Sequence, residues 1–508
     1  MNNFNENIIR EMIKIKADCP ADLSLTKRRM AKKHKTSFPN NISLLKTYHE
    51  LLRDKRIRPS ERIEQLLKTR PIRSLSGIVN VAVLTKPYPC PGKCIFCPTE
   101  KGIPKSYLSG EPAVERAKRL HFDPYLQVKK RIEMLENEGH PTDKVELRII
   151  GGTWSFYPKK YQEWFIKKCF DACLKKNARS LKESQKLNEK AEHRLIGISV
   201  ETRPDFINEK EIKHLREMGI TMVELGVQSI YDDVLKSSKR GHGTKETIKA
   251  TKLLKDAGFK ILFQIMLNLP GSSPKRDEKM FEELFSNPDL QPDLLKIYPC
   301  ALLKEAPLYK QWKKGRFHPY KAKQLETIIK KIKKNIPYYV RIQRITRDIP
   351  SQRIAAGATK ISNLRQTISG QSECRCIRCR EIKGKYDKKE KVFLFRQEYP
   401  SSGGKELFLS FENKERTKLY SLMRLRLSSE GKAVIRELHT YGQLISIGKS
   451  SKSAQHKGMG KKLIEGAEKI ARKEFKVKKI AVISGVGARD YYRKLGYRLE
   501  DTYMVKNI

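Results

Sequence analysis

The stretch Tyr88-Pro-Cys-Pro-Gly-Lys-Cys-Ile-Phe-Cys97 places Cys90, Cys94 and Cys97 within one short loop. Cubane iron–sulfur clusters are normally held by four cysteine thiolates, so three thiolates leave one iron without a protein ligand. Such an iron can chelate S-adenosylmethionine and pass it one electron, which cleaves the C5′–S bond to give a 5′-deoxyadenosyl radical. A zinc knuckle is the alternative, but a structural zinc site takes four ligands, and no histidine or fourth cysteine is close in sequence. The spacing therefore predicts a 4Fe-4S site for radical chemistry.

Around this loop, short apolar runs alternate with longer amphipathic stretches. The runs predicted to be buried parallel strands are residues 78–84, 145–150, 195–200, 222–227 and 261–266. Helices that end at a glycine are predicted for residues 123–139, 209–219 and 245–258. Repeated strand–helix units of this size predict an α/β fold, a full or partial (β/α) barrel over residues 76–340.

Unusual residues directly follow three of the predicted strands. They are Gly151-Gly152-Thr153, Glu201 with Arg203, and Gln228. A paired glycine lets backbone approach a ligand closely, and this one is placed to receive the amino group of S-adenosylmethionine, with Glu201 and Arg203 on its ribose and carboxylate. Taken singly, Gly-Gly is more often a turn and Glu with Arg more often an ion pair. Their shared place at the carboxyl ends of barrel strands favours a cofactor site.

The charge of the chain indicates a polyanionic partner. Its 508 residues include 107 Lys and Arg against 57 Asp and Glu, a formal net charge of +50. Nucleic acid is the leading candidate, although a basic proteome would also raise the count. The densest run lies at residues 27–35, within a helical, basic region of residues 1–75. This run is either a solvated face or an arm that contacts nucleic acid.

Cysteine usage and hydropathy predict a cytoplasmic protein. Six of the ten cysteines lie in two tight clusters whose spacing suits metal binding better than disulfides. The N-terminus has no signal-peptide pattern, and no apolar run approaches the ~20 residues of a membrane span.

The second cluster, Cys374-Arg-Cys376-Ile-Arg-Cys379, follows the predicted barrel in a linker of residues 341–390. Its flanking arginines make an apolar core location difficult, so zinc is the expected occupant. Cys300 is the candidate for the fourth ligand, which would tie the linker to the barrel. The alternative is a set of reduced cysteines without metal.

Residues 391–508 follow a different pattern. Strands are predicted at 392–396, 407–411, 420–427 and 433–438, followed by Gln455-His-Lys-Gly458-Met459-Gly460, a helix over 461–475 and a strand at 480–483. A glycine-containing turn that opens a helix presents backbone N–H groups to a pyrophosphate. With the Tyr491-Tyr492 pair that follows, this order resembles the GNAT acetyltransferase fold, which binds acetyl-CoA.

A radical S-adenosylmethionine barrel joined to a GNAT domain resembles one family closely, the catalytic subunit of Elongator in its single-protein bacterial or archaeal form. The resemblance runs from about residue 77 to residue 508 and includes Thr85-Lys-Pro-Tyr-Pro-Cys90, Glu201-Thr-Arg-Pro-Asp205 and Arg436-Glu-Leu-His439. It implies an enzyme that forms 5-carboxymethyluridine at the wobble position of tRNA, with the anticodon stem-loop as partner. In the mechanism proposed for this family, the deoxyadenosyl radical takes hydrogen from the methyl group of acetyl-CoA, the carbon radical adds to the base, and the thioester is hydrolysed.

The resemblance also assigns residue roles. Cys90, Cys94 and Cys97 would hold the cluster, and Lys144 would contact acetyl-CoA from the barrel side. Tyr491 and Tyr492 would lie near the thioester. The remaining residues expected at the acetyl-CoA site are Glu437, Leu438, His439, Thr440, Gln455, Gly458, Met459, Gly460 and Lys461.

Two other functions fit parts of the sequence. A protein lysine acetyltransferase would use the C-terminal domain alone, but the charge of +50 disfavours a basic histone-like substrate. A tRNA-binding scaffold would have lost its cofactor residues, and this chain keeps them. The sequence leaves open a homodimer, accessory subunits, the electron donor, the tRNA species and the residue that hydrolyses the thioester.

Overall fold

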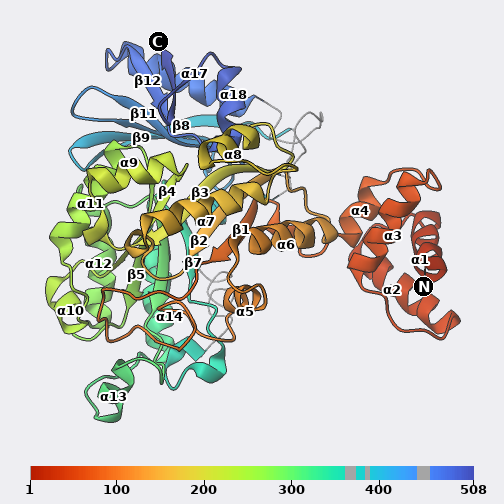
Figure 1. Ribbon diagram of the computed structural model, residues 1–508, viewed down its shortest axis with the longest axis horizontal. Helices are drawn as coiled ribbons and strands as arrows, with labels where there is room; N and C mark the ends of the chain where they lie inside the picture. The colour runs from red at the N-terminus through yellow and green to blue at the C-terminus, as the bar shows by residue number, and fades with distance from the viewer. Residues whose placement is uncertain (1, 361–372, 384–388, 443–457) are drawn as a thin grey trace.

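The computed structural model describes residues 2–360, 373–383, 389–442 and 458–508. These residues form a small N-terminal helical bundle, a central parallel sheet with helices on its outer face, and a C-terminal sheet domain (Figure 1). Gln455 lies outside the described residues. No helix in the described part of the chain has both the length and the apolar character needed to span a bilayer.

The N-terminal bundle has its own apolar core. Its helices are α1 (Asn2–Lys14), α2 (Pro20–Lys33), α3 (Asn41–Arg53) and α4 (Glu61–Leu67). Ile8, Met12, Leu44 and Tyr48 are fully buried between them. These residues recur at helical spacing, so each helix presents one apolar face to the others. A short 3₁₀ turn, η1 (Pro71–Arg73), follows the bundle. The bundle lies beside one end of α6 (Pro124–Asn137) in Figure 1.

The central sheet is parallel, and its strands are hydrogen-bonded in sequence order from β1 to β7. Its strands are β1 (Val79–Leu84), β2 (Lys144–Ile150), β3 (Arg194–Thr202), β4 (Met222–Gln228), β5 (Lys260–Leu267), β6 (Leu294–Pro299) and β7 (Arg341–Ile345). Because β1 and β7 are the two edges of this sheet, the barrel is open. The structure confirms the partial (β/α) barrel and all five predicted strands, and it adds β6 and β7.

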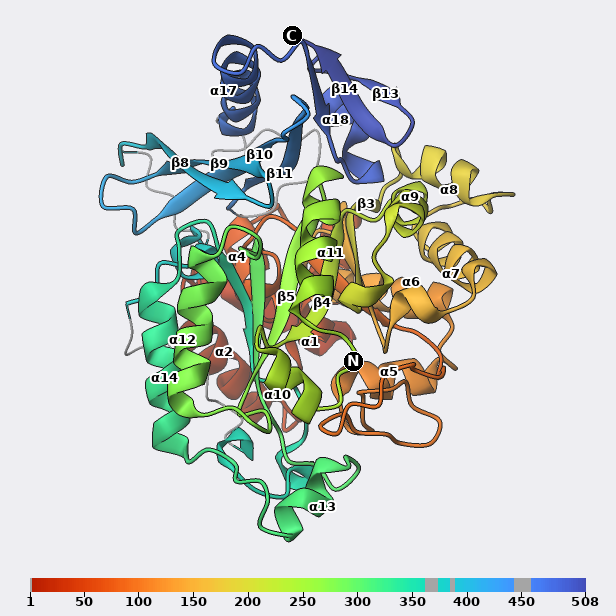
Figure 2. The same cartoon turned by 90° about the vertical axis from the view of Figure 1, so that its left-hand side faces the viewer.

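Most of the connecting helices pack on the outer face of the sheet (Figure 2). The helices between and after the strands are α5 (Pro112–Arg119), α6 (Pro124–Asn137), α7 (Lys159–Asp171), α8 (Leu181–Asn188), α9 (Glu209–Glu217), α10 (Asp232–Ser237), α11 (Thr244–Asp256), α12 (Pro274–Ser286), α13 (Leu308–Lys313), α14 (Ala322–Asn335) and α16 (Ile377–Arg380). Helix α13 lies apart from the sheet, at the lower end of the molecule in Figure 2. In β2, Val145, Leu147 and Ile149 are buried against these helices, whereas Glu146 and Arg148 alternate onto the concave face. That face therefore carries charge along its length.

The C-terminal domain is a mixed sheet with helix α17 packed on it. The strands are β8 (Phe393–Ser401), β9 (Gly404–Glu412), β10 (Leu419–Leu427), β11 (Ala433–Thr440), β12 (Lys479–Val482), β13 (Arg498–Glu500) and β14 (Tyr503–Asn507), and the helices are α17 (Met459–Lys473) and α18 (Arg489–Arg493). Their order is β13-β14-β12-β11-β10-β9-β8, and β11 and β12 pair in parallel. Leu463, Ile464 and Ala467 of α17 fill the core against the sheet.

This domain lies over the amino ends of the barrel strands (Figure 2). Arg436 of β11 makes ion pairs with Asp293, which precedes β6, at 2.5 Å. Tyr339 before β7 and Tyr399 of β8 stack with ring centroids 4.1 Å apart. Apolar residues of the two parts belong to one continuous core. A shared core of this kind fixes the two domains relative to each other.

Candidate active site

The cysteine loop follows β1 at the carboxyl end of the sheet. Cys94 is buried, while Cys90 and Cys97 are partly exposed. Cys94 and Cys97 are linked through the backbone, because the N–H of Cys97 donates to the carbonyl of Cys94 at 3.2 Å. Burial, with Cys94 next in effect, raises the pKa of the Cys97 thiol to about 11. Binding of a metal centre by this thiol would therefore release a proton.

The spacing of the three thiols fits a cluster better than a single ion. In the part of the chain that the structure describes, Cys374, Cys376 and Cys379 form a group whose ligand atoms all lie within 4.8 Å of one another. Cys90, Cys94 and Cys97 do not form so tight a group. In a cubane each cysteine binds a different iron, which requires wider separation of the sulfurs than one ion does.

Two arginines approach this loop. Arg240 Nη1 donates to Cys94 Sγ at 3.3 Å, and its Nη2 donates to the carbonyl of Gly226 at 2.6 Å. Arg203 is paired with Asp205 at 2.8 and 2.9 Å, but its Nη1 is buried without a hydrogen-bond partner. A Cβ atom added at Gly92 would lie 2.6 Å from this Nη1. The orphaned donor beside the cysteines fits a site for an anionic group that binds there.

The predicted glycine turn lies next to the cysteines. Gly151 and Gly152 have φ values of +125° and +65°, conformations that favour glycine. Thr153 Oγ1 lies 3.6 Å from Cys90 Sγ. Gln228, at the end of β4, also has a positive φ of 74°. The chain thus has a left-handed backbone conformation just after β2 and at the end of β4, a feature that is concentrated at ligand sites.

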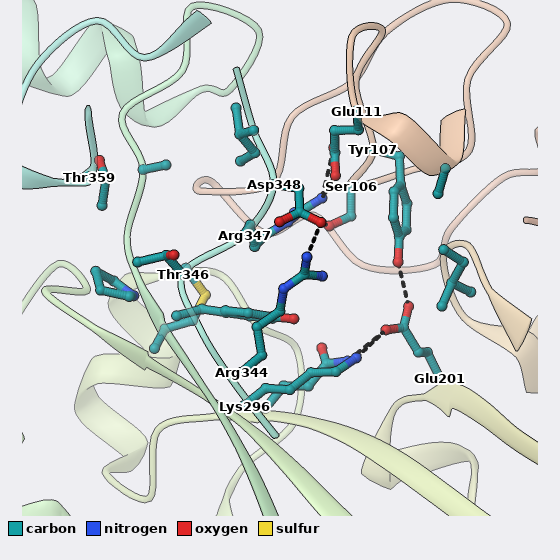
Figure 3. Close-up of a pocket in the computed structure, with 18 of the residues that line it drawn as sticks. Ser106, Tyr107, Glu111, Glu201, Lys296, Arg344, Thr346, Arg347, Asp348 and Thr359 are labelled. Atoms are coloured by element: carbon teal, nitrogen blue, oxygen red, sulfur yellow. Dashed lines mark hydrogen bonds and ion pairs between the residues drawn. The ribbon is translucent and has the colours of Figure 1, made fainter. Parts of the chain in front are cut away.

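Glu201 lies in a cavity of about 630 Å³ at the carboxyl end of the barrel, together with Cys97 and Gln228. Its carboxylate accepts hydrogen bonds from Tyr107 at 2.8 Å, Gln264 at 3.0 Å and Lys296 at 2.9 Å (Figure 3). Burial acts to raise the pKa of Glu201, but Lys296, Tyr107 and Arg347 together lower it, so the group stays ionised. Glu201 therefore already has three protein donors on its carboxylate, while Arg203 faces the cysteine loop.

Several side chains of the cavity were not singled out from the sequence. Lys296 of β6 is buried and also pairs with Glu224 of β4. Arg347 pairs with Glu111 at 3.0 Å, and Arg344 pairs with Asp348 (Figure 3). One signal was available for Lys296, since a lysine inside the apolar run Leu294-Leu-Lys-Ile297 needs a buried partner. The sequence around Arg344 and Arg347 is not an apolar run, so it gave no such signal for these two residues.

The opposite end of the concave face reaches the C-terminal domain. Lys144 begins β2, and burial lowers its pKa. Lys260 of β5 lies 3.9 Å from Glu146 and 3.3 Å from Glu437 of β11. Burial opposes the ionisation of Glu437, but Lys260 and then Arg424 lower its pKa to about 2. Glu437, predicted for acetyl-CoA binding, is therefore an ionised residue at the floor of the barrel.

The neighbouring predicted residues have separate partners. His439 Nε2 donates to the carbonyl of Ser76 at 2.8 Å, which places the histidine against the start of the barrel. Thr440 Oγ1 and Ser421 Oγ are 2.9 Å apart. Burial lowers the pKa of His439, so its imidazole is neutral near pH 7.

The start of α17 brings other predicted residues together. A Cβ atom added at Gly460 would lie 3.1 Å from Tyr491 Oη, 3.6 Å from Thr440 Oγ1 and 3.8 Å from Leu438 Cδ2. Gly458, just before the helix, has a φ of +69°. Met459 is buried, and Lys461 points outward and lies 3.7 Å from Glu465. The space over Gly460 is thus bounded by three side chains of the predicted acetyl-CoA site.

The two adjacent tyrosines differ. Tyr491 is 42% exposed, whereas Tyr492 is buried in the core of the C-terminal domain. Burial raises the pKa of both phenols. Tyr491 therefore faces the space at the helix start, and Tyr492 packs behind it.

The second cysteine cluster forms a compact thiol group, but Cys300 is not part of it. The sulfurs of Cys374, Cys376 and Cys379 lie within 4.8 Å of one another, around the start of α16. Cys300 is buried in a different apolar cluster with Leu269, Leu302 and Phe317. The structure therefore does not bring the expected fourth ligand to the triad. The sequence pattern near Cys300 could not reveal this, because its burial depends on distant segments.

Comparisons with known proteins agree with this architecture. The family model of the Radical SAM superfamily matches residues 88–284, and that of the Radical_SAM C-terminal domain matches residues 292–373. The chain is 45% identical over 497 residues to tRNA uridine(34) acetyltransferase of Methanocaldococcus infernus, covering 92% of each protein. It is 39% identical over 474 residues to Elongator complex protein 3 of Homo sapiens, covering 87% of this chain and 86% of that protein.

A solved structure matches over most of the chain. It is that of archaeal Methanocaldococcus infernus Elp3 with an N-terminal deletion, with a TM-score of 0.75 and 42% identity. The match covers 85% of this chain and all of that one. The chain therefore belongs to the radical SAM superfamily and, within it, to the family of tRNA uridine(34) acetyltransferase and Elongator complex protein 3.

Proposed function

We propose that this protein carboxymethylates C5 of the wobble uridine of tRNA, with acetyl-CoA as the source of the two-carbon group. The names of its relatives support this substrate and position. The observation that carries the proposal is the polar concave face of the barrel. It has the cysteine loop and the cavity at one end and Glu437 at the other, so both co-substrates can reach one interior.

Cys90, Cys94 and Cys97 are the residues that would hold a 4Fe-4S cluster, and the cluster would supply one electron for the reductive cleavage of S-adenosylmethionine. Arg203 and Arg240 place positive charge beside the cysteines. Gly151, Gly152, Thr153 and Gln228 offer backbone and small side chains to the bound S-adenosylmethionine. Glu201, fixed by three donors, holds Lys296 and Tyr107 at the cavity wall.

Acetyl-CoA is proposed to bind at the start of α17. Backbone N–H groups from Gly458 to Lys461 would receive the pyrophosphate. Tyr491 and Glu437 to Thr440 would line the thioester end, with Lys144 on the barrel side. The neutral His439, whose Nε2 donates to the carbonyl of Ser76, keeps Nδ1 to accept a proton there. Glu437, whose pKa is held at about 2, is a weak base and instead holds Lys260 and Arg424 in place.

Zinc is the proposed occupant of the Cys374, Cys376 and Cys379 group. Three thiols within 4.8 Å supply three tetrahedral positions. The backbone already joins α16 to the residue before β7, since Ile377 N–H donates to the carbonyl of Val340 at 2.9 Å, and a metal would order the segment that makes this contact. Addition of a zinc chelator is expected to lower Tm and release one zinc per chain, and a metal-free preparation with unchanged Tm would contradict the assignment.

The proposed domain limits are 1–75, 76–340, 341–390 and 391–508, and a cytoplasmic location with tRNA as partner follows from the same proposal. The proposal is compatible with a homodimer and with accessory subunits, and it requires neither.

The test is product formation by the reconstituted protein. Anaerobic protein with tRNA, S-adenosylmethionine, a reductant and acetyl-CoA should yield carboxymethyluridine on nucleoside mass spectrometry. Cys94→Ser should abolish the product and release of 5′-deoxyadenosine. Cys19→Ser, which changes an exposed cysteine of the N-terminal bundle, should retain both. If Cys94→Ser still forms the product, the proposed radical mechanism is wrong. Acetylation of a protein without any RNA requirement would favour the lysine acetyltransferase alternative.

A further inference from the structure

Four arginines gather where the N-terminal bundle meets the barrel. Arg70 precedes η1 and Arg73 ends it, Arg116 lies on α5, and Arg131 lies on α6, close enough for their charges to interact. Figure 1 shows α6 extending from the barrel to the bundle, with α5 beside β1. The cluster therefore joins three segments that are separate in sequence.

Few carboxylates face this arginine cluster. Glu138, the residue directly after α6, is buried and pairs with Arg73. Asp348, across the cavity mouth, pairs with Arg344. Arg131 Nη1 donates to the thioether of Met134 at 3.1 Å, a weak acceptor. Within the described part of the chain, no ion pair to a carboxylate is recorded for Arg70, Arg116 or Arg131.

The arginines act on one another. Burial, followed by the charges of Arg73 and Arg116, lowers the pKa of Arg131 to about 10. Burial and the charge of Arg73 also lower the pKa of Arg116. Holding like charges together costs free energy in the absence of an anion. Such an arrangement is typical of a site whose anion arrives with a ligand.

The position of Arg116 connects the cluster to the reaction. Arg116 lines the same cavity as Cys97 and Glu201. A nucleobase that enters this cavity of about 630 Å³ leaves its sugar–phosphate backbone at the mouth. Arginine forks match phosphate oxygens in a bidentate manner, so a phosphodiester fits this position.

We propose that the cluster of Arg70, Arg73, Arg116 and Arg131 binds the RNA backbone phosphates next to the nucleotide that enters the cavity. This inference rests on the proposed function, because it takes RNA as the substrate. The four arginines act as positioning residues. They hold the strand so that one base is directed toward Cys97 and Glu201.

Binding of an anticodon stem-loop RNA, measured by fluorescence anisotropy at several KCl concentrations, tests the proposal. Arg116→Gln and Arg131→Gln should each weaken binding about threefold to tenfold at low salt. Each lost phosphate contact should lower the log–log salt slope by about 0.7. Arg498→Gln, the same change at an exposed residue of β13 that pairs with Glu500, should leave affinity and slope unchanged.

Thermal unfolding of the same variants without RNA separates a binding role from a structural one. Removing one of several like charges should leave the Tm of Arg131→Gln unchanged or raise it. A marked fall in Tm would mean that Arg131 supports the fold, and it would overturn the proposal for that residue. The Arg131→Lys variant should keep the salt slope, since it keeps the charge, but should bind less tightly.

Two results would sink the proposal. The first is a double variant, Arg116→Gln with Arg131→Gln, whose salt slope equals that of the wild type. The second is a rise in Tm on addition of inorganic phosphate that the variants lose, while their affinity for RNA equals that of the wild type. This result would indicate a site for a small anion. The proposed function fails separately, if wild-type protein makes no modified uridine while the variants still weaken RNA binding.

Discussion

At the scale of single residues, the two glycines after β2 have different structural demands. Gly151 has a φ of +125°, and an added Cβ would lie 2.2 Å from the buried Thr85 Oγ1. Gly152 has a φ of +65°, and a Cβ there meets nothing within 4 Å. The Gly-Gly pair in the sequence predicted that the backbone approaches a ligand closely. Only the structure shows that a side chain at Gly151 would clash with Thr85, whereas Gly152 faces open space.

Alanine substitutions test this difference. Gly152→Ala should cost about 1 kcal/mol of stability, the usual cost of a left-handed conformation in a residue with a Cβ. Gly151→Ala should cost about 1–3 kcal/mol more, because Thr85 must move and lose its hydrogen bond to the Gly151 carbonyl. Thermal unfolding of the two variants measures the order, and equal Tm values would contradict the steric account.

A buried histidine gives the fold a defined response to acid. His140 Nε2 donates to the carbonyl of Thr69 at 3.0 Å, and its Nδ1 lies 2.9 Å from Ser74 Oγ. Burial, followed by the charge of Lys68, lowers its pKa from 6.5 to about 4. Between these values the unfolded chain binds more protons than the folded chain, so stability falls as the pH falls from about 6.5 to about 4.

The variant His140→Gln should reduce this pH dependence, since glutamine keeps an N–H donor near Thr69 but does not titrate. Tm measured at several values from pH 7 to pH 4 should fall less steeply in His140→Gln than in the wild type. His34→Gln, at an exposed histidine, is the control. If Tm falls with pH equally steeply in His140→Gln and in the wild type, His140 is not the group that causes the loss of stability in acid.

At the scale of elements, the helices and strands with regular periodicity were predictable, whereas two barrel strands were not. Five strands were found as apolar runs, but β6 contains Lys296, and β7, Arg-Ile-Gln-Arg-Ile over residues 341–345, has three polar residues in five. Their charged side chains face the concave interior, where Glu201, Glu224 and Glu381 neutralise them. Those partners come from other strands and segments, so a local pattern could not reveal them.

The start of α17 is the element on which acetyl-CoA binding depends. Gly460→Val would fill the space bounded by Tyr491, Thr440 and Leu438. Acetyl-CoA affinity should fall at least tenfold, which corresponds to about 1.4 kcal/mol, while iron content and S-adenosylmethionine cleavage stay unchanged. Isothermal titration with acetyl-CoA measures the first, and iron analysis and 5′-deoxyadenosine release measure the others.

The matched control is Gly466→Val in the same helix, where an added Cβ meets nothing within 4 Å. Both substitutions place a β-branched residue in a helix and carry a similar cost in helix propensity. If the two variants bind acetyl-CoA equally, the space over Gly460 is not the binding site.

At the scale of the whole molecule, the sequence indicated how the chain is divided but not how its parts are joined. The basic stretch and the apolar spacing of residues 1–75 predicted a helical region, and the change of pattern near residue 391 located the last domain. The joint depends on arginines of the C-terminal sheet that are fully buried against the barrel floor. A buried arginine within a strand is visible in sequence as a charged residue in an apolar run, but its partner Asp293 lies 143 positions away.

Arg436 is the centre of this joint. Its guanidinium contacts Asp293 at 2.5 Å, Glu406 at 2.8 Å and the carbonyl of Phe259 at 2.7 Å. Burial opposes the ionisation of Asp293, but Arg436 and then Arg424 hold its pKa below the usual range. The two domains thus share ionised groups that neither could bury alone.

Arg436→Met should therefore destabilise the protein by about 3–5 kcal/mol, because it leaves Asp293 and Glu406 buried with fewer partners. Calorimetry should show the wild type unfolding in one transition that includes both domains, and the variant should show a lower first transition. The double variant Arg436→Met with Asp293→Asn should recover part of the loss, since it removes one of the uncompensated charges. If Arg436→Met keeps the wild-type Tm and a single transition, the apolar core shared by the two domains is sufficient to join them, and the polar contacts at the barrel floor serve the site rather than the fold.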